Sequence, residues 1–434
     1  MPESRSIAVS ARPTRVRHHV LWLTVAVYMI TYMDRVAIST AVPSIRDEFG
    51  FTMVTVGWVL SSFRWGYALF QIPGGWMGDR VGPRSALAVI VAWWSVFTSL
   101  TAAAWNASSM LVIRFLLGMG EAGAFPIATR SLSRWMLPSE RGFAQGLTHA
   151  GSRLGAAVTP ALVVVLITRY GWRSSFLVFG TLGLAWSAVW LWYYRNTPGE
   201  HHAVNDAERD LIARSVGGPR TATSRSVPWG VILSQRNLWT LSAMYFFYGY
   251  CLAVYLDWFP SYLKAHRGLS LARMGIFASL PLLAGTAGNV LGGSLSDWLA
   301  RRDYGLTRAR RSVAMVGFLT AAAAIVPATL AGSPEWCVLL TCIAVFGLEV
   351  TVGVSWAIAL DIGGDYAGSV SAVMNTCGNI GSAISPAMLA YLVGAYGWNV
   401  PFFVASAMCA AAAALHLRID AARRIGFAPE RGDK

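Results

Sequence analysis

The chain has 434 residues, of which 55% are apolar and only 13% are charged, whereas soluble domains carry about 25% charged residues. Its mean hydropathy of +0.49 excludes an ordinary soluble enzyme and favours a protein that crosses a lipid bilayer several times. The net charge of +14 would also fit a nucleic-acid-binding protein, so the positions of the basic residues decide between the two classes.

Twelve apolar stretches are long enough to cross the ~30 Å hydrocarbon layer of a bilayer as helices. The first is too long for a signal peptide and contains Asp34 and Arg35, so we expect it to be retained. In chain order the stretches are 20–42, 54–78, 85–105, 108–129, 143–168, 174–194, 238–263, 272–298, 312–331, 335–360, 367–393 and 398–417.

The basic residues lie mainly on one side of these predicted spans. Of the 35 Lys and Arg residues, four lie within spans and most others fall in the termini and in the loops on the same side. The opposite loops contain Arg46, Arg169, Arg173, Lys264, Arg267 and Arg273. This bias predicts that both termini are cytoplasmic, and it explains the positive charge without nucleic acid as a partner.

The second part of the chain repeats the first. RYGWRSSFLVFG, from Arg169, resembles AYGWNVPFFVAS, from Ala395, and Pro160 and Pro386 end similar stretches 226 positions apart. We therefore predict an all-α membrane protein of two pseudo-symmetric six-helix halves, with a substrate site at their interface. The expected segments are a tail (1–19), a first half (20–194), a cytoplasmic linker (195–236), a second half (237–418) and a tail (419–434).

Apart from Asp297 and Glu335 at span ends, four acidic residues fall inside the spans, on the first and fourth helices of each half: Asp34, Glu121, Asp257 and Glu349. A charge at the centre of a spanning helix costs about 2.5–3.5 kcal/mol on insertion scales, so each needs a partner, water or a function. Their recurrence every three helices predicts that they face one shared cavity. The alternative is four unrelated carboxylates that hydrogen-bond between helices, and Asp257, near an outer end, could simply be hydrated.

Four arginines accompany these acids within the spans: Arg35, Arg64, Arg114 and Arg153. Arginine recognises carboxylates through its planar fork, and nearby carboxylates can couple anion binding to their own protonation. The mixture predicts an anion site with titratable neighbours. For Arg64 and Arg153, the alternative is a structural ion pair or a side chain that reaches the membrane surface.

The motif GGWMGDRVGPR follows the second span and has a degenerate copy, GGSLSDWLARR, in the second half. We expect its charged residues to clamp helices across a gate, although they could also only set topology. These residues are Asp79, Arg80, Arg84 and Asp297. The five cysteines match no metal-binding spacing, and we find no phosphate-binding loop or nucleophile elbow, so we expect no metal, no cofactor and no enzymatic activity.

These motifs and the six-plus-six layout resemble the major facilitator superfamily over essentially the whole chain. MDRVAIS, WGYALFQIPGGW, RFLLGMGEAGAFP and the linker RNTPGEHHAVNDAERDLI resemble more narrowly its anion:cation symporter family. The resemblance implies proton-coupled import of an organic anion, such as a sugar acid, by alternating access. It gives proton-titrating roles to Asp34 and Glu121, substrate carboxylate binding to Arg35, and coupling to Arg114.

The resemblance also implies contacts with the body of the substrate at Tyr67, Ser355, Trp356 and Asn375. Arg64, Arg153 and Glu349 depart from the family pattern and are further candidate anion contacts. The two arginines would suit a substrate with two carboxylates, but the sequence leaves the number of carboxylates open. We expect a monomer in a bacterial inner membrane. The rival function is a proton antiporter of the same fold that exports drugs or metabolites.

Overall fold

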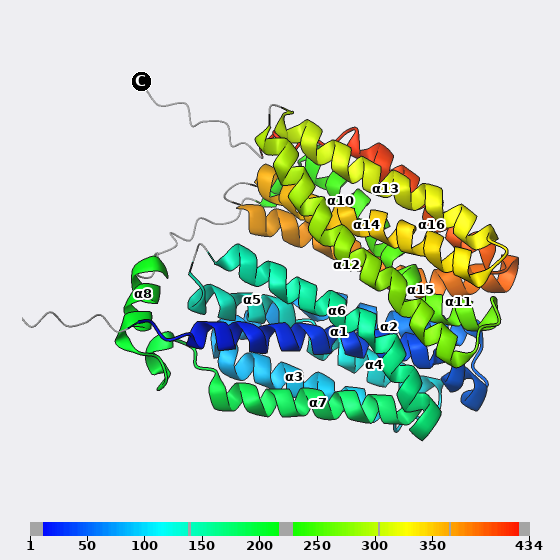
Figure 1. The fold of residues 1–434 in the computed structure, drawn as a ribbon, viewed down its shortest axis with the longest axis horizontal. Helices are drawn as coiled ribbons and strands as arrows, with labels where there is room; N and C mark the ends of the chain where they lie inside the picture. The colour runs from blue at the N-terminus through cyan, green and yellow to red at the C-terminus, as the bar shows by residue number, and fades with distance from the viewer. Residues whose placement is uncertain (1–11, 138–139, 217–228, 303, 364–365, 425–434) are drawn as a thin grey trace, which may run out of the picture.

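The computed structural model describes residues 12–137, 140–216, 229–302, 304–363 and 366–424. Within these ranges a few side chains, including that of Asp79, lie outside the description. Every regular element in the described ranges is a helix, and the helices form two bundles that lie side by side (Figure 1). The fold is therefore all-α, as predicted.

The first bundle contains all helices before the linker. They are α1 (Val16–Phe49), α2 (Met53–Val81), α3 (Pro83–Thr101), α4 (Ala107–Glu121), α5 (Ala124–Trp135), α6 (Arg141–Tyr170) and α7 (Trp172–Tyr193). The second bundle contains α10 (Arg236–Ala253), the π-helical turn η2 (Val254–Trp258), α11 (Phe259–Ala265), α12 (Leu271–Arg301), α13 (Leu306–Leu330), α14 (Pro334–Gly363), α15 (Ala367–Tyr396) and α16 (Asn399–His416). Each predicted span coincides with one helix or with consecutive helical segments.

Nine helical segments in the described ranges are long and apolar enough to cross a membrane. The three other predicted spans coincide with α2, with α15 and with the run from α10 to α11. Large apolar side chains also cover outward faces of the bundles, including Leu69, Val112 and Val316, which are 57–63% exposed. Such surfaces are stable against lipid but not against water. The chain is a multi-pass membrane protein.

The sequence repeat lies at corresponding places in the two bundles. Pro160 is inside α6 and Pro386 is inside α15. Each of these helices ends at a glycine in the left-handed region, Gly171 with φ 80° and Gly397 with φ 81°. A residue with a side chain rarely adopts this conformation. The two glycines therefore turn the chain in the same way before α7 and α16.

Two of the expected helices are interrupted beside an acidic residue. The predicted span 108–129 is not one helix, because α4 ends at Glu121 and α5 begins at Ala124. Pro126 has no N–H and its ring clashes with the carbonyl four residues earlier, which breaks the helix at this point. In the second bundle, Pro260 follows the π-helical turn that contains Asp257. Both carboxylates therefore lie where the regular backbone pattern fails.

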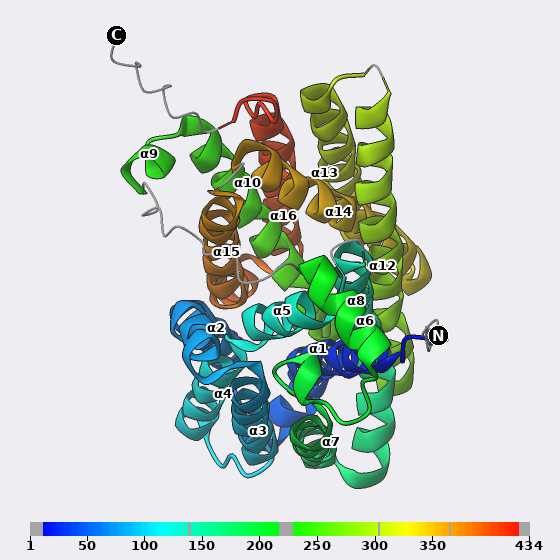
Figure 2. The same ribbon diagram turned by 90° about the vertical axis from the view of Figure 1, so that its left-hand side faces the viewer.

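The linker between the bundles includes η1 (Pro198–Glu200), α8 (Asp206–Val216) and α9 (Trp229–Leu233). Glu208 of α8 is fully buried and accepts hydrogen bonds from the Thr14 hydroxyl at 2.6 Å and from Arg17 Nη1 at 3.0 Å. Arg17 also donates to Glu140 at 3.0 Å. These bonds attach α8 to the end of the first bundle, which faces the viewer in Figure 2.

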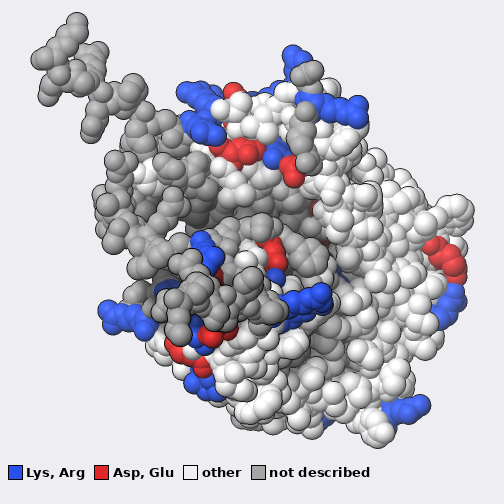
Figure 3. All heavy atoms as spheres, turned by 60° about the vertical axis from the view of Figure 1, so that its left-hand side comes forward, with Lys and Arg blue, Asp and Glu red and all other residues white. Residues whose placement is uncertain are grey.

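The two bundles touch closely at the end opposite the linker. A Cβ atom at Gly57 of α2 would lie 2.8 Å from the Cβ of Ala390 on α15, and one at Gly275 of α12 would lie 2.7 Å from Val164 on α6. The indole of Trp58 donates to the hydroxyl of Tyr391 at 3.4 Å. At the linker end the bundles spread apart (Figure 1), and the surface between them is hollowed (Figure 3).

Candidate functional site

Eight charged side chains meet in the interior between the bundles. The first half supplies four arginines and two acids, and the second half supplies two acids. They are Arg35, Arg64, Arg114, Arg153, Asp34, Glu121, Asp257 and Glu349. Ion pairs and electrostatic contacts connect six of them. The Arg153–Glu349 pair lies beside this group, because Arg153 and Arg35 contact the same ring of Tyr32. The structure thus brings together the charges that the sequence predicted to share a cavity.

Arg35 of α1 occupies an aromatic enclosure within the first half. Its Nε donates to the carboxylate of Glu121, and its guanidinium carbon lies 4.5 Å from the ring centroid of Tyr67 and 5.1 Å from that of Tyr32. Aromatic faces attract cations through their quadrupole. The side chain of Arg35 is still 18% exposed. The surrounding side chains therefore fix the position of the Arg35 guanidinium, but they do not cover it completely.

Asp34 and Arg114 are buried beside this pair, with exposures of 1% and 2%. Among the described residues, no hydrogen bond of good geometry reaches either carboxylate oxygen of Asp34, although the Trp94 side chain interacts with it. Nε and Nη1 of Arg114 also lack a partner there. Asp34 lies within electrostatic reach of Arg114 and Glu121. A buried charge without hydrogen bonds is destabilising. These two side chains are the least satisfied charges in the network.

Arg64 of α2 joins the first half to the second. Its Nε and Nη2 donate to the two oxygens of Asp257 at 2.9 Å each, and its Nη1 donates to Ser382 of α15. Asp257 is only 5% exposed, so it is a buried partner of Arg64 and not a hydrated surface residue. The two-pronged geometry is the strong form of an arginine–carboxylate pair.

Arg153 of α6 forms the second ion pair between the halves. Its Nη2 lies 2.9 Å from Oε2 of Glu349 on α14. Glu349 also accepts from the Tyr248 hydroxyl at 3.1 Å and from the amide of Asn289 at 3.2 Å. The Arg153 guanidinium carbon lies 5.5 Å from the ring centroid of Tyr32. Arg35 and Arg153 therefore contact the same tyrosine ring.

The four residues expected to contact the body of a substrate differ from one another in their surroundings. Tyr67 belongs to the enclosure of Arg35. The hydroxyl of Ser355 donates to the Thr351 carbonyl of its own helix at 2.7 Å, and the indole of Trp356 donates to the Tyr245 hydroxyl at 2.9 Å. Asn375 is half-buried on α15.

Sequence reasoning missed several polar neighbours of the charges. Gln71 of α2 accepts from Asn379 of α15 at 3.0 Å, which adds a contact between the halves. The other missed residues are Tyr32, Tyr245, Tyr248 and Asn289. Polar residues inside apolar spans were the signal available for them.

The two copies of the loop motif hold neighbouring helices within their own halves. Nη2 of Arg84 donates to the Leu191 carbonyl of α7 at 2.7 Å. Asp297 lies 2.5 Å from Arg310 of α13, which also pairs with Asp361 of α14 at 3.1 Å. Arg80 is exposed. The side chain of Asp79 falls outside the described part of the structure.

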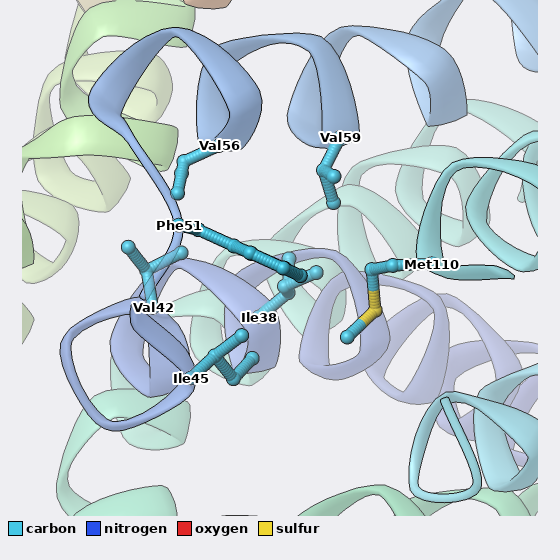
Figure 4. A pocket seen from close by; sticks show the side chains of 7 residues that line it. All are labelled: Ile38, Val42, Ile45, Phe51, Val56, Val59 and Met110. Carbon is cyan, nitrogen blue, oxygen red and sulfur yellow. The ribbon is translucent and has the colours of Figure 1, made fainter. Parts of the chain in front are cut away.

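A small pocket lies apart from the charged network, between α1, α2 and α4 (Figure 4). Its lining is entirely apolar and consists of Ile38, Val42, Ile45, Phe51, Val56, Val59 and Met110. Such a lining provides no donor for a charged solute. The charged network, which lies between the halves, is the candidate binding site.

The two bundles of apolar helices meet at one end and enclose a hollow at the other, and charged residues lie between them. This arrangement is that of a membrane transporter. Residues 24–386 match the family model described as Major Facilitator Superfamily. The chain belongs to this superfamily and, by its relatives, to the anion:cation symporter family. It is a transporter and not an enzyme.

The curated relatives carry organic anions according to their names. The chain is 40% identical over 407 residues to a probable sulfoacetate transporter of Cupriavidus necator, and the match covers 94% of each chain. It is 32% identical to a probable galactarate/D-glucarate transporter of Bacillus subtilis, with 90% of this chain and 89% of the relative covered. A hexuronate transporter of the same organism is 30% identical, with 85% and 86% covered.

A solved structure supports the fold independently. A bacterial homologue of the human lysosomal transporter Spinster, in an inward-facing and unoccupied conformation, superposes with a TM-score of 0.80. The match covers 96% of this chain and 99% of that one at 17% identity. At this identity the similarity concerns the fold alone.

Proposed function

We propose that this protein imports a small organic anion together with protons by alternating access. The observation that carries the proposal is the buried group formed by Asp34, Arg35, Arg114 and Glu121. It combines a partly exposed arginine with two carboxylates inside the membrane-spanning region. The sugar-acid and sulfonate names of the relatives support an anionic substrate.

Arg35 is the primary anion-binding residue in this proposal. It is partly exposed, and its only carboxylate partner among the described residues is Glu121, which belongs to the same half. Protonation of Glu121 removes the negative charge from that partner. The guanidinium then offers its fork to a substrate carboxylate. Tyr67, Ser355, Trp356 and Asn375 are proposed to contact the rest of the substrate.

Asp34 and Glu121 are the proposed proton carriers. Both are fully buried inside the membrane-spanning region, where a negative charge is costly unless it is paired or hydrogen-bonded. Arg114 lies within electrostatic reach of both, so each protonation changes the local field that Arg114 experiences. Arg114 therefore links the two carboxylates in the proposed cycle.

The proposed cycle begins with the site open to the outside, where both carboxylates take up protons. Arg35 is freed and the substrate docks on it. The halves, residues 20–194 and 237–418, then rock about the site. On the inside Glu121 loses its proton and pairs again with Arg35, which expels the substrate. The Arg35–Glu121 ion pair and the close packing at Gly57 and Gly275 support a state that follows release.

The direction of opening follows from the predicted topology. Both termini and the linker are proposed to be cytoplasmic, so the hollowed end faces the cytoplasm. Asp79, Arg80, Arg84 and Asp297 lie on that side and are proposed to rearrange when the gate closes. We further propose that the protein works as a monomer in a bacterial inner membrane.

An exporter of drugs or metabolites remains the rival function within the same fold. Four arginines inside the spans oppose it, because lipophilic cations would meet positive charge at the centre of the path. The rival predicts extrusion driven by a proton gradient. The proposed importer predicts accumulation under the same gradient.

The test is uptake of radiolabelled sulfoacetate, glucarate and galactonate into proteoliposomes with an inward proton gradient, with and without a protonophore. We expect accumulation of at least one acid, abolished by the protonophore. Asp34→Asn and Glu121→Gln should each abolish accumulation. Glu48→Gln is the matched control, since Glu48 pairs with Arg173 at the opposite end and is 42% exposed. Full accumulation in both Asp34→Asn and Glu121→Gln would contradict the proposal.

A further inference from the structure

The charges at the site are divided unequally between the halves. The first half supplies four arginines against Asp34 and Glu121, whereas the second half supplies only Asp257 and Glu349. Both acids of the second half pair with arginines of the first. The second half thus presents two carboxylates to an excess of positive charge. These two carboxylates occupy positions that an anionic solute could also take.

The two ion pairs between the halves differ in how many nitrogens of the arginine have a hydrogen-bond or ion-pair partner. Each nitrogen of the Arg64 guanidinium has a partner, because Nε and Nη2 bind Asp257 and Nη1 binds Ser382. Among the described residues, Arg153 has one contact with a carboxylate, from Nη2 to Glu349. Its side chain is 14% exposed, close to the 15% of Arg64. Glu349 keeps two further donors, Tyr248 and Asn289. Glu349 can therefore lose Arg153 without losing all of its hydrogen bonds.

Arg153 is also close to the primary anion-binding residue. Its guanidinium carbon lies 5.5 Å from the Tyr32 ring centroid, and that of Arg35 lies 5.1 Å from the same centroid. The two cations are no farther apart than the sum of these distances. A small molecule with an acidic group at each end can span such a separation.

We propose that the substrate carries two acidic groups, the first bound by Arg35 and the second by Arg153, where it displaces Glu349. This inference rests on the proposed function. When the halves separate, Arg153 loses Glu349, and a buried arginine without a partner is costly. A dianion supplies a replacement partner, whereas a monoanion leaves Arg153 unpaired. Arg64, by contrast, acts as a latch between the halves and does not distinguish the two kinds of anion.

The test uses pairs of anions that differ in one charge: glucarate against gluconate, and sulfoacetate against methylsulfonylacetate. Binding to the purified full-length protein is measured by calorimetry and uptake in proteoliposomes. We expect the wild type to prefer a dianion by about tenfold or more. Arg153→Gln should weaken dianion binding by about tenfold or more and leave monoanion binding within about threefold.

Glu349→Gln should change the affinity for the dianion in the opposite direction. It removes the internal competitor for Arg153 while its amide can still meet Tyr248 and Asn289, so the Kd for the dianion should fall. A merely structural ion pair would weaken binding in both variants. Arg173→Gln, which affects an exposed pair at the opposite end, is the control and should leave both anions unchanged.

Three results would overturn the inference. The first is a wild type that prefers the monoanions, and the second is an Arg153→Gln variant that loses both kinds of anion equally. In either case transport itself persists, so the proposed function stands. The third is a wild type that transports none of the anions, which would overturn the proposed function and this inference with it.

Discussion

Arg64 and Asp257 connect the two halves through two parallel hydrogen bonds of 2.9 Å. Arg64 lies on a regular helix of the first half, whereas Asp257 lies in the π-helical turn before Pro260. The irregular backbone of η2 therefore carries one partner of an ion pair that holds the halves together. In the proposed alternating-access cycle, this pair opens and closes.

Removing one member of this pair should destabilise the protein. Asp257→Ala leaves Arg64 buried without its partner, which costs about 3–5 kcal/mol in comparable cases. The double variant Arg64→Met, Asp257→Leu removes both charges and should unfold close to the wild-type temperature. Apparent Tm in one detergent measures both effects. An Asp257→Ala protein as stable as the wild type would show that the pair is not buried from water in solution.

Gly57 should be essential for closing the end opposite the linker. A Cβ atom there would lie 2.8 Å from both Ala390 Cβ and the Pro386 carbonyl oxygen, so Gly57→Val should hold α2 and α15 apart. Substrate binding should persist while transport falls at least about tenfold. Gly146→Val is the control, because a Cβ at Gly146 meets nothing within 4 Å. Normal transport by Gly57→Val would contradict the close packing.

The sequence predicted which charged residues gather at the site, but it did not predict which of them pair with one another. The helices, the repeat and the eight charges inside the spans follow from hydropathy and from the rarity of charges in such segments. The Arg64–Asp257 and Arg153–Glu349 pairs did not follow, because they form only when the halves meet and the sequence alone does not fix that arrangement. The sequence left hydration of Asp257 near an outer end as an alternative to the shared cavity, because a hydropathy profile cannot show which interior face a helix turns toward its neighbour.

The sequence contains a proline near each helix break. Pro126 lies five residues after Glu121 and Pro260 lies three residues after Asp257, and proline disrupts the preceding turn of a helix. The contact of Ser355 with its own backbone was not predictable. A serine in a helix can turn its hydroxyl toward the carbonyl four residues earlier or toward a ligand, and only packing decides between them.

The attachment of the linker should depend on pH through Glu140. The hydrogen bond from Arg17 holds the pKa of Glu140 below its ordinary value, which is about 4.3. A lowered pKa in the folded protein adds stability above the unfolded pKa, and this stability is lost as the pH falls through the folded pKa. The Tm difference between the wild type and Glu140→Gln should therefore shrink from about pH 6 to about pH 3.5. A constant difference would contradict this role.

In the proposed function, the anion and the proton cross the membrane together. Proteoliposomes that contain a pH-sensitive dye are given an inward gradient of a transported acid, with no initial pH difference and the membrane potential clamped. If the account is right, substrate entry acidifies the interior, and in Asp34→Asn the acidification disappears. Entry of the same acid without acidification in the wild type would contradict it.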